Sequence, residues 1–220
     1  MSVAEDQGSW AKGGIYHVLL ASLLLLLGLQ PFAEVAGGSL VRLGVAGVLL
    51  ACIAVVASRR RLFIIGLVLG IPAVLLLFVP GRIPTATGGL LLMATLVFIC
   101  FVILRRVSKH PIVTSATVSA SLVVYLAFGV IWAQAYRLVE HFGPGSFTGL
   151  SGTGADAVQR DLFYYSYVTL TTLGYGDINP VSPEARSLAI TEAVVGQLYL
   201  VVLVAGLVGM HLAQRQSRPE

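Results

Sequence analysis

Long apolar stretches with almost no charged residues constrain this chain more than any other feature. A helix needs about 20 apolar residues to cross roughly 30 Å of hydrocarbon. Of the 220 residues, 57% are hydrophobic and 11% are charged, whereas a typical soluble domain has about 25% charged residues. So few charges cannot cover a soluble surface, and so much apolar surface excludes a disordered chain. The sequence therefore predicts an all-α, polytopic membrane protein.

Six segments are apolar and long enough to be predicted as membrane-spanning helices. They are residues 15–29, 40–57, 62–79, 87–104, 114–136 and 187–212. Residues 161–172 also look helical, but they are too few and too polar to cross, so we expect a re-entrant segment before the last span. The Gly- and Ser-rich residues 141–160 are expected to form an exposed loop.

Basic residues are unevenly divided between the two predicted sides of the membrane. Nine of the 14 Lys and Arg residues fall near span ends on the side that also holds both termini. Because cytoplasmic span ends are enriched in Lys and Arg, both termini are predicted to be cytoplasmic in a multi-pass protein of the cell membrane. The net charge of +4 then marks topology rather than nucleic-acid binding. Basic clusters at 59–61 and 105–106 equally suit anionic lipid headgroups.

The segment 169–177, TLTTLGYGD, carries the chemistry. A dehydrated cation needs a cage of oxygens, which backbone carbonyls supply where successive residues alternate between left- and right-handed dihedral angles. Glycine reaches the left-handed region cheaply, and Gly174 and Gly176 alternate as such a strand requires. Thr172 adds a hydroxyl below the carbonyls, and Tyr175 is large enough to anchor the strand from behind. One chain supplies one strand, so four subunits are expected around one pore.

TTLGYGD resembles the signature T-V/I/L-G-Y/F-G-D of the potassium channel pore family. The resemblance extends over roughly residues 112–212 and is greatest to bacterial pore subunits of the simple ion channel type, here with four extra N-terminal helices. It implies a homotetramer with K+ as the permeant ion and no other cofactor. The resemblance assigns K+ coordination to the carbonyls of Thr172, Leu173, Gly174 and Tyr175, together with the Thr172 hydroxyl.

The same resemblance implies supporting and gating roles for other residues. Asp177 caps the outer mouth after Gly176, and Tyr164 and Tyr165 form an aromatic pair that packs against the filter. Val168 stands where many relatives have a glutamate that pairs with the outer aspartate, so tyrosine hydroxyls, such as that of Tyr165, are expected to hold the filter instead. On the inner helix, the resemblance assigns a hinge to Gly196 and the pore-lining face to Gln197, Leu200, Val204 and Val208.

Glu192 is the one acidic residue well inside a predicted span, and such residues are usually functional. It is expected to support the filter through a hydrogen bond to a pore-helix hydroxyl such as that of Thr169. A direct ion or proton site and a pH-sensing role are the alternatives. For Gly196, close helix packing is the alternative to a hinge.

The predicted organisation is a four-helix N-terminal domain (1–110), a pore domain (111–213) and a short cytoplasmic tail (214–220). A voltage sensor needs several basic residues in its fourth helix, since each charge moved contributes about 2.3 kcal/mol per 100 mV. Residues 87–104 contain none, so weak or absent voltage gating is expected. No soluble regulatory domain is identifiable.

The predicted function is therefore passive K+ conduction, not enzymatic catalysis, because no nucleophile constellation or nucleotide-binding loop is present in the sequence. Two alternatives stay open. The chain is a non-conducting or regulatory channel subunit, or it is a subunit of a potassium-uptake transporter.

Overall fold

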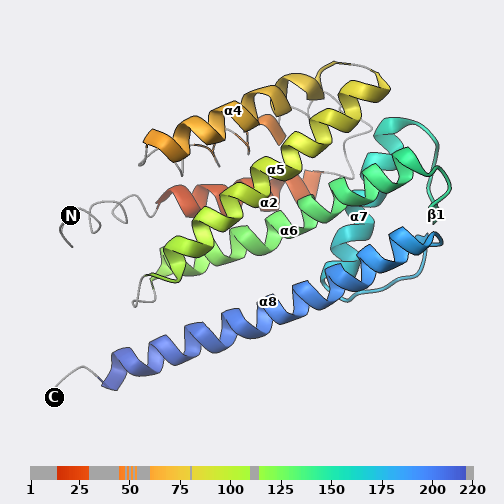
Figure 1. The fold of residues 1–220 in the computed structure, drawn as a ribbon. Coiled ribbons are helices and arrows are strands. Elements are labelled where there is room, and N and C mark those ends of the chain that lie inside the picture. Colours follow the sequence, from red (N-terminus) through yellow and green to blue (C-terminus); the bar gives the residue numbers. More distant parts are fainter. Residues whose placement is uncertain are drawn as a thin grey trace. The chain divides into compact units, whose positions relative to one another are not determined.

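The computed structural model is almost entirely helical and describes residues 14–29, 45–47, 49, 51, 53, 60–79, 81–109 and 114–216. Two short strands, β1 (Phe147–Thr148) and β2 (Asn179–Pro180), pair antiparallel, with Thr148 opposite Asn179. The helices are α2 (Gly14–Leu29), α4 (Arg60–Leu77), α5 (Arg82–Val107), α6 (Ser115–Phe142), α7 (Ala155–Leu170) and α8 (Pro183–Gln216) (Figure 1).

Three of the described helices are long and apolar enough to cross a membrane, over Ala86–Val107, Ser115–Phe142 and Pro183–Gly206. A shorter apolar stretch, Gly14–Gly28, lies in α2. The predicted all-α membrane fold is confirmed. The number of crossings stays a prediction, and most of the predicted span 40–57 lies outside the described residues.

The loop after α6 differs from the prediction. Residues 141–160 do not form an exposed loop throughout, because α6 runs on to Phe142, β1 follows, and α7 begins at Ala155. The re-entrant helix therefore starts earlier than the predicted residue 161. Hydropathy marks where apolar residues stop, whereas backbone hydrogen bonding continues a helix through polar residues. Asp156 lies in the first turn of α7, where a carboxylate stabilises the helix dipole.

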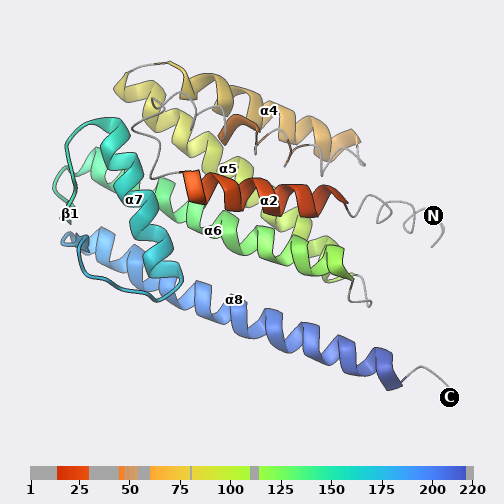
Figure 2. The same ribbon diagram turned by 180° about the vertical axis from the view of Figure 1, so that it is seen from behind.

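The chain forms two compact units. Unit 1 comprises Met1–Val68, Phe98–Val124 and Val201–Glu220, and unit 2 comprises Leu69–Val97 and Tyr125–Leu200. Within unit 1, the Ser119 hydroxyl and His17 Nδ1 lie 2.7 Å apart and link α6 to α2. Within unit 2, the C-terminal part of α6, α7 and the first part of α8 lie together, and Figures 1 and 2 both show α7 alongside its two neighbours.

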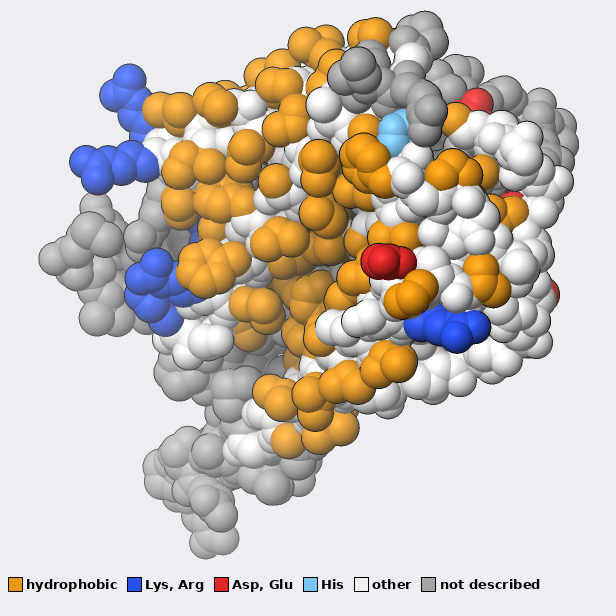
Figure 3. All heavy atoms as spheres, turned by 45° about the vertical axis from the view of Figure 1, so that its right-hand side comes forward, with side chains coloured by type: hydrophobic (Ala, Val, Ile, Leu, Met, Phe, Trp, Pro, Cys, Tyr) orange, Lys and Arg blue, Asp and Glu red, His pale blue; other side chains and the backbone are white. Residues whose placement is uncertain are grey.

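Large hydrophobic side chains are exposed along α4, α5 and α8. Figure 3 shows them in orange across the face drawn, with Lys and Arg side chains gathered mainly at one edge of that view. Such an exposed apolar surface suits hydrocarbon rather than water.

Candidate functional site

The segment that follows α7 has an alternating backbone. Thr172 has a φ of 59°, Gly174 of 60° and Gly176 of 79°, whereas Leu173 and Tyr175 between them keep negative φ values. A positive φ is rare for a β-branched residue such as threonine and costs free energy. Thr172 is the one non-glycine residue with a positive φ among the described residues. The alternation expected at Gly174 and Gly176 is therefore present, and Thr172 adds a third, strained position with a positive φ.

Both ends of this strand are anchored by hydrogen bonds. At its start, the backbone N–H of Thr172 donates to the carbonyl of Thr169 at 3.0 Å, and that of Leu173 donates to Val168 at 2.9 Å. At its end, the Asn179 side-chain amide donates to the Gly176 carbonyl at 2.8 Å. Leu173 and Tyr175 are 55% and 67% exposed within one chain. The strand is thus fixed at its two ends and open along its length.

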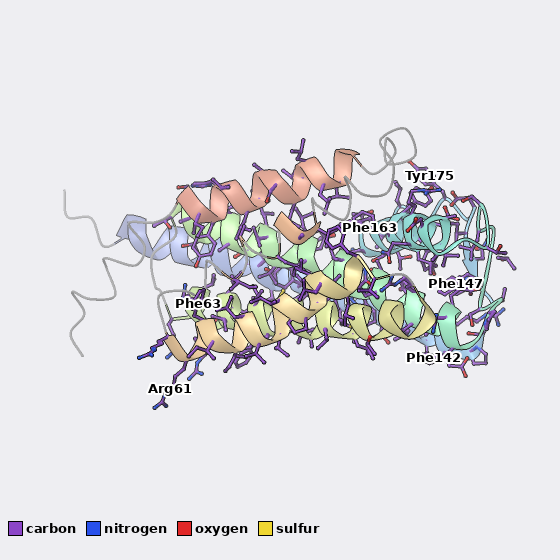
Figure 4. All side chains as sticks on the ribbon, turned by 90° about the horizontal axis from the view of Figure 1, so that it is seen from above. Arg61, Phe63, Phe142, Phe147, Phe163 and Tyr175 are labelled. Atoms are coloured by element: carbon purple, nitrogen blue, oxygen red, sulfur yellow. The ribbon has the colours of Figure 1, made fainter. Side chains whose placement is uncertain are left out.

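The predicted aromatic pair divides between two environments. The Tyr165 ring is buried and packs edge-on against Tyr136 and Phe147, at centroid distances of 5.1 and 5.4 Å. Its hydroxyl hydrogen-bonds to Thr169 on its own helix. Unlike the buried rings of this cluster, the ring of Phe142 at the end of α6 is 74% exposed (Figure 4). The aromatic cluster therefore fixes α7 against α6 and seats the loop between them.

Tyr164, in contrast to its neighbour, is directed toward the end of the filter segment. Its hydroxyl donates a hydrogen bond to the Asp177 carboxylate. Partial desolvation, that hydrogen bond and the negative charge of Asp177 raise the pKa of the Tyr164 hydroxyl, although the residue is exposed. A tyrosine hydroxyl thus contacts the outer aspartate, and it belongs to Tyr164 rather than to Tyr165.

Glu192 lies fully buried in α8 and joins three helices. Its Oε1 lies 2.5 Å from the Ser166 hydroxyl of α7. Its Oε2 accepts a hydrogen bond from the Tyr136 hydroxyl of α6. The partner on the pore helix is a hydroxyl, as the sequence indicated, but it is Ser166 and not Thr169. Ser166 and Tyr136 were not singled out from the sequence, because only the position of the helices identifies which hydroxyls reach Glu192.

The hydrogen atoms available to this group can be counted. Ser166 Oγ also lies 2.8 Å from the carbonyl oxygen of Gly129. A serine hydroxyl carries one proton and cannot fully donate to two acceptors. If Glu192 is a protonated acid, it donates to Ser166, which donates to Gly129, while Tyr136 donates to the other carboxyl oxygen. Every contact is then a complete hydrogen bond, which makes the neutral acid the form that fits.

At Gly196, α8 lies in close contact with the end of α7. A Cβ there would lie 2.7 Å from Leu170 Cδ1 and 3.2 Å from the Leu170 carbonyl oxygen. That carbonyl also accepts a hydrogen bond from the Tyr125 hydroxyl at 3.2 Å. The Tyr125 ring in turn stacks against Tyr199 at 6.1 Å. The close helix packing that was the alternative to a hinge at Gly196 is therefore present, and α8 is continuous through this position.

The residues predicted to line the pore are partly accessible in one chain. Gln197 and Val204 are exposed and Leu200 is half-buried. Val208 lies in α8, but its side chain is outside the described part of the structure.

Comparisons with known proteins identify the region around the strand. The ion channel family matches residues 112–211, which include α6, the loop, α7, the strand and most of α8. This region is similar to an ion channel pore, and the similarity is to channels and not to an enzyme family. No solved structure matches the chain.

Three curated relatives are potassium channels by name. Two pore potassium channel c of Oryza sativa subsp. japonica is 37% identical over 87 residues, which are 40% of this chain and 17% of the relative. The inward rectifier potassium channel Kirbac3.1 of Paramagnetospirillum magnetotacticum is 35% identical over 83 residues, which are 36% of this chain and 24% of the relative. Two-pore potassium channel 5 of Arabidopsis thaliana is 32% identical over 96 residues, which are 44% of this chain and 21% of the relative. The chain thus spans about a fifth of the length of these relatives.

The chemistry that the site can offer is set by its oxygens. Carbonyl and hydroxyl oxygens are the ligands that replace the hydration shell of an alkali cation. Among the described residues, no three His, Cys, Asp or Glu side chains gather as a metal-binding group.

Proposed function

We propose that the chain is the subunit of a homotetrameric, K+-selective channel that conducts K+ passively down its electrochemical gradient. The observation that carries the proposal is the alternation of positive φ values at Thr172, Gly174 and Gly176, within a region that matches the ion channel family. Each subunit contributes the carbonyls of residues 172–175 and the Thr172 hydroxyl, and Gly176 and Asp177 complete the outer end.

Four copies of the strand are required because one chain supplies a single strand, which cannot surround an ion by itself. The strand is exposed along its length in a single chain, so its carbonyls can meet those of other copies around a common axis. Stacked rings of carbonyl oxygens then replace the ion's water. Gln197, Leu200, Val204 and Val208 line the cavity below it, and Gly196 is the hinge of the inner helix.

The charge distribution supports the proposed orientation, with both termini cytoplasmic in the cell membrane. Arg60, Arg61, Arg105, Arg106 and Lys109 belong to unit 1, whereas every acidic residue that the structure describes belongs to unit 2, together with Arg82, Arg137, Arg160 and Arg186. Cytoplasmic span ends of a membrane protein are enriched in Lys and Arg. The proposed organisation is an N-terminal domain (1–110), a pore domain (111–213) and a short cytoplasmic tail (214–220).

Weak or absent voltage gating follows from the fourth predicted span. Between residues 87 and 104, α5 has no Lys or Arg, so it has no charge to move through the membrane field. A steep conductance–voltage relation in symmetric K+ solutions would contradict this part of the proposal.

The test is ion flux into liposomes that contain the purified protein, with Na+ as the control ion and Ba2+ as the blocker. A K+-selective flux that Ba2+ blocks is the expected result. Gly174→Ala is the matched inactive variant, because its φ of 60° is unfavourable for any residue with a Cβ, although the space around it is open. Absence of K+ flux from a protein shown to be tetrameric would instead favour a regulatory subunit.

A further inference from the structure

The loop between α6 and α7 contacts the outer end of the filter strand. The proposed function gives this loop no role. Residues 146–149 lie before α7 in sequence, yet they reach the backbone of residues 177–182, which follows the strand. We call Glu140, residues 147–149 and Asn179 the outer clip.

Glu140 fixes the start of the outer clip. Its carboxylate accepts hydrogen bonds from the backbone N–H groups of Gly145, at 2.7 Å, and Phe147, at 3.1 Å. Phe147, labelled in Figure 4, is 4% exposed. Its ring packs edge-on against the rings of Tyr136 and Tyr165. A carboxylate and a buried ring thus hold β1 in one place on the end of α6.

Because β1 pairs with β2, the backbone after the filter is held in place by β1. Thr148 pairs with Asn179, and the Ser146 carbonyl accepts a hydrogen bond from the backbone N–H of Val181 at 2.8 Å. From the paired position, the Asn179 side chain donates to the Gly176 carbonyl at 2.8 Å. The last glycine of the filter strand is therefore bonded to a residue whose own position depends on β1.

Gly149 makes the closest approach between the loop and the outer mouth. A Cβ at this position would lie 1.9 Å from the carbonyl oxygen of Asp177 and 3.0 Å from its carbonyl carbon. Both are backbone atoms, which cannot rotate away as the end of a side chain can. The φ of Gly149 is also +87°. Two independent reasons, the backbone angle and the absence of space, thus require glycine at 149.

We propose that the outer clip sets the position of the outer end of the filter, so that Gly149 and Asn179 are positioning residues for K+ selectivity. This inference rests on the proposed function. Gly149 has no side chain, and the Asn179 side chain donates to the Gly176 carbonyl. They act through the backbone of Gly176 and Asp177, whose carbonyls cannot keep their places if the loop behind them moves.

The chain contains a matched pair of glycines for the test. Gly145 has the same φ of +87°, but nothing lies within 4 Å of a Cβ built on it. Gly149→Ala and Gly145→Ala therefore carry the same backbone strain, and only the first displaces Asp177. In the liposome assay, Gly149→Ala is expected to lower the K+ over Na+ flux ratio below that of Gly145→Ala, because the displacement of Asp177 is the difference between the two variants. Equal ratios in the two variants would overturn the proposal.

Asn179→Ala tests the clip without crowding the backbone, in case Gly149→Ala fails to fold. Thr148→Ala is its control, since the Thr148 hydroxyl reaches only the Asn179 carbonyl, at 3.4 Å. We expect Asn179→Ala, but not Thr148→Ala, to lower the flux ratio while the melting temperature of the tetramer stays unchanged. An unchanged ratio in Asn179→Ala would refute the role of Asn179 as a positioning residue.

Hydrogen exchange separates failure of this inference from failure of the proposed function. If the wild-type protein passes no K+, the proposed function is wrong, and the clip is judged by exchange alone. Backbone amides of residues 174–178 are expected to exchange faster in Gly149→Ala and Asn179→Ala than in their controls. Equal exchange in all four variants would show that the loop does not hold this backbone.

Discussion

The proton on Glu192 gives the sharpest prediction for the buried group that joins α6, α7 and α8. Glutamine has the same shape as a protonated glutamate, with an NH₂ group as donor and a carbonyl oxygen as acceptor. In Glu192→Gln, the amide can donate to Ser166 and accept from Tyr136. Ser166 remains free to donate to the Gly129 carbonyl.

The magnitudes separate a neutral from an ionised Glu192. If the acid is neutral, Glu192→Gln changes the free energy of unfolding by no more than roughly 0.5 kcal/mol, because the hydrogen bonds are exchanged like for like. If it is ionised, the same change removes hydrogen bonds to a charged group, which contribute about 1.5–3 kcal/mol each. Glu192→Ala is costly in either case, by about 2–4 kcal/mol, because it leaves a cavity and two hydroxyls without their partner.

The assay is denaturant unfolding of the purified protein in detergent micelles, followed by tryptophan fluorescence. Glu184→Gln serves as the control, since Glu184 is an exposed carboxylate in the first turn of the same helix. The expected order of stability places Glu192→Gln beside the wild type and Glu192→Ala well below both. If Glu192→Gln is as unstable as Glu192→Ala, the proton count is wrong.

Three further predictions follow from packing and hydrogen bonding in unit 2. Gly196→Ala should destabilise the protein by about 1–3 kcal/mol, because the added Cβ would collide with Leu170 in a packed contact. Gly206→Ala is the control and should not destabilise it, because nothing lies within 4 Å of a Cβ at that position. Thermal unfolding distinguishes the two variants. Gly129→Ala should lower the free energy of unfolding by a similar amount, since its Cβ would lie 2.5 Å from the Tyr167 ring in a tight interior. It should also break the 2.6 Å hydrogen bond from the Tyr167 hydroxyl to the Leu126 carbonyl. Faster amide exchange in α7 would reveal that loss. Tyr164→Phe should alter Ba2+ block of K+ flux because it removes the donor to Asp177, whereas Tyr165→Phe should leave block unchanged; the reverse result would return the filter contact to Tyr165.

The helices could be predicted from the sequence because each is a long apolar run. The predicted span 15–29 corresponds to α2 (Gly14–Leu29), and the span 62–79 to α4 (Arg60–Leu77). Residues 174 and 176 could be identified in the same way, since the spacing of the glycines states the backbone requirement directly. The left-handed conformation of Thr172 could not, because local propensity opposes it and only the surrounding fold imposes it.

The contacts behind the strand could not be predicted either. A two-residue strand such as β1 has no alternation of polar and apolar residues to detect. The pairing of Thr148 with Asn179 joins residues far apart in sequence. Tyr165 was expected against the filter, but the choice between adjacent tyrosines depends on the rotation of α7, and the structure places Tyr165 among Tyr136 and Phe147. Hydroxyl partners for a buried acid depend on tertiary position in the same way.

The sparse packing of α8 within its own chain has a consequence for biogenesis. Only 11% of its most apolar stretch is buried, whereas the corresponding share for α6 is 61%. In the proposed tetramer, a newly inserted subunit would expose this helix to lipid tails, which solvate leucine and valine as well as another helix does. Association of the proposed subunits would then gain little from hydrophobicity and would depend on shape and close contact.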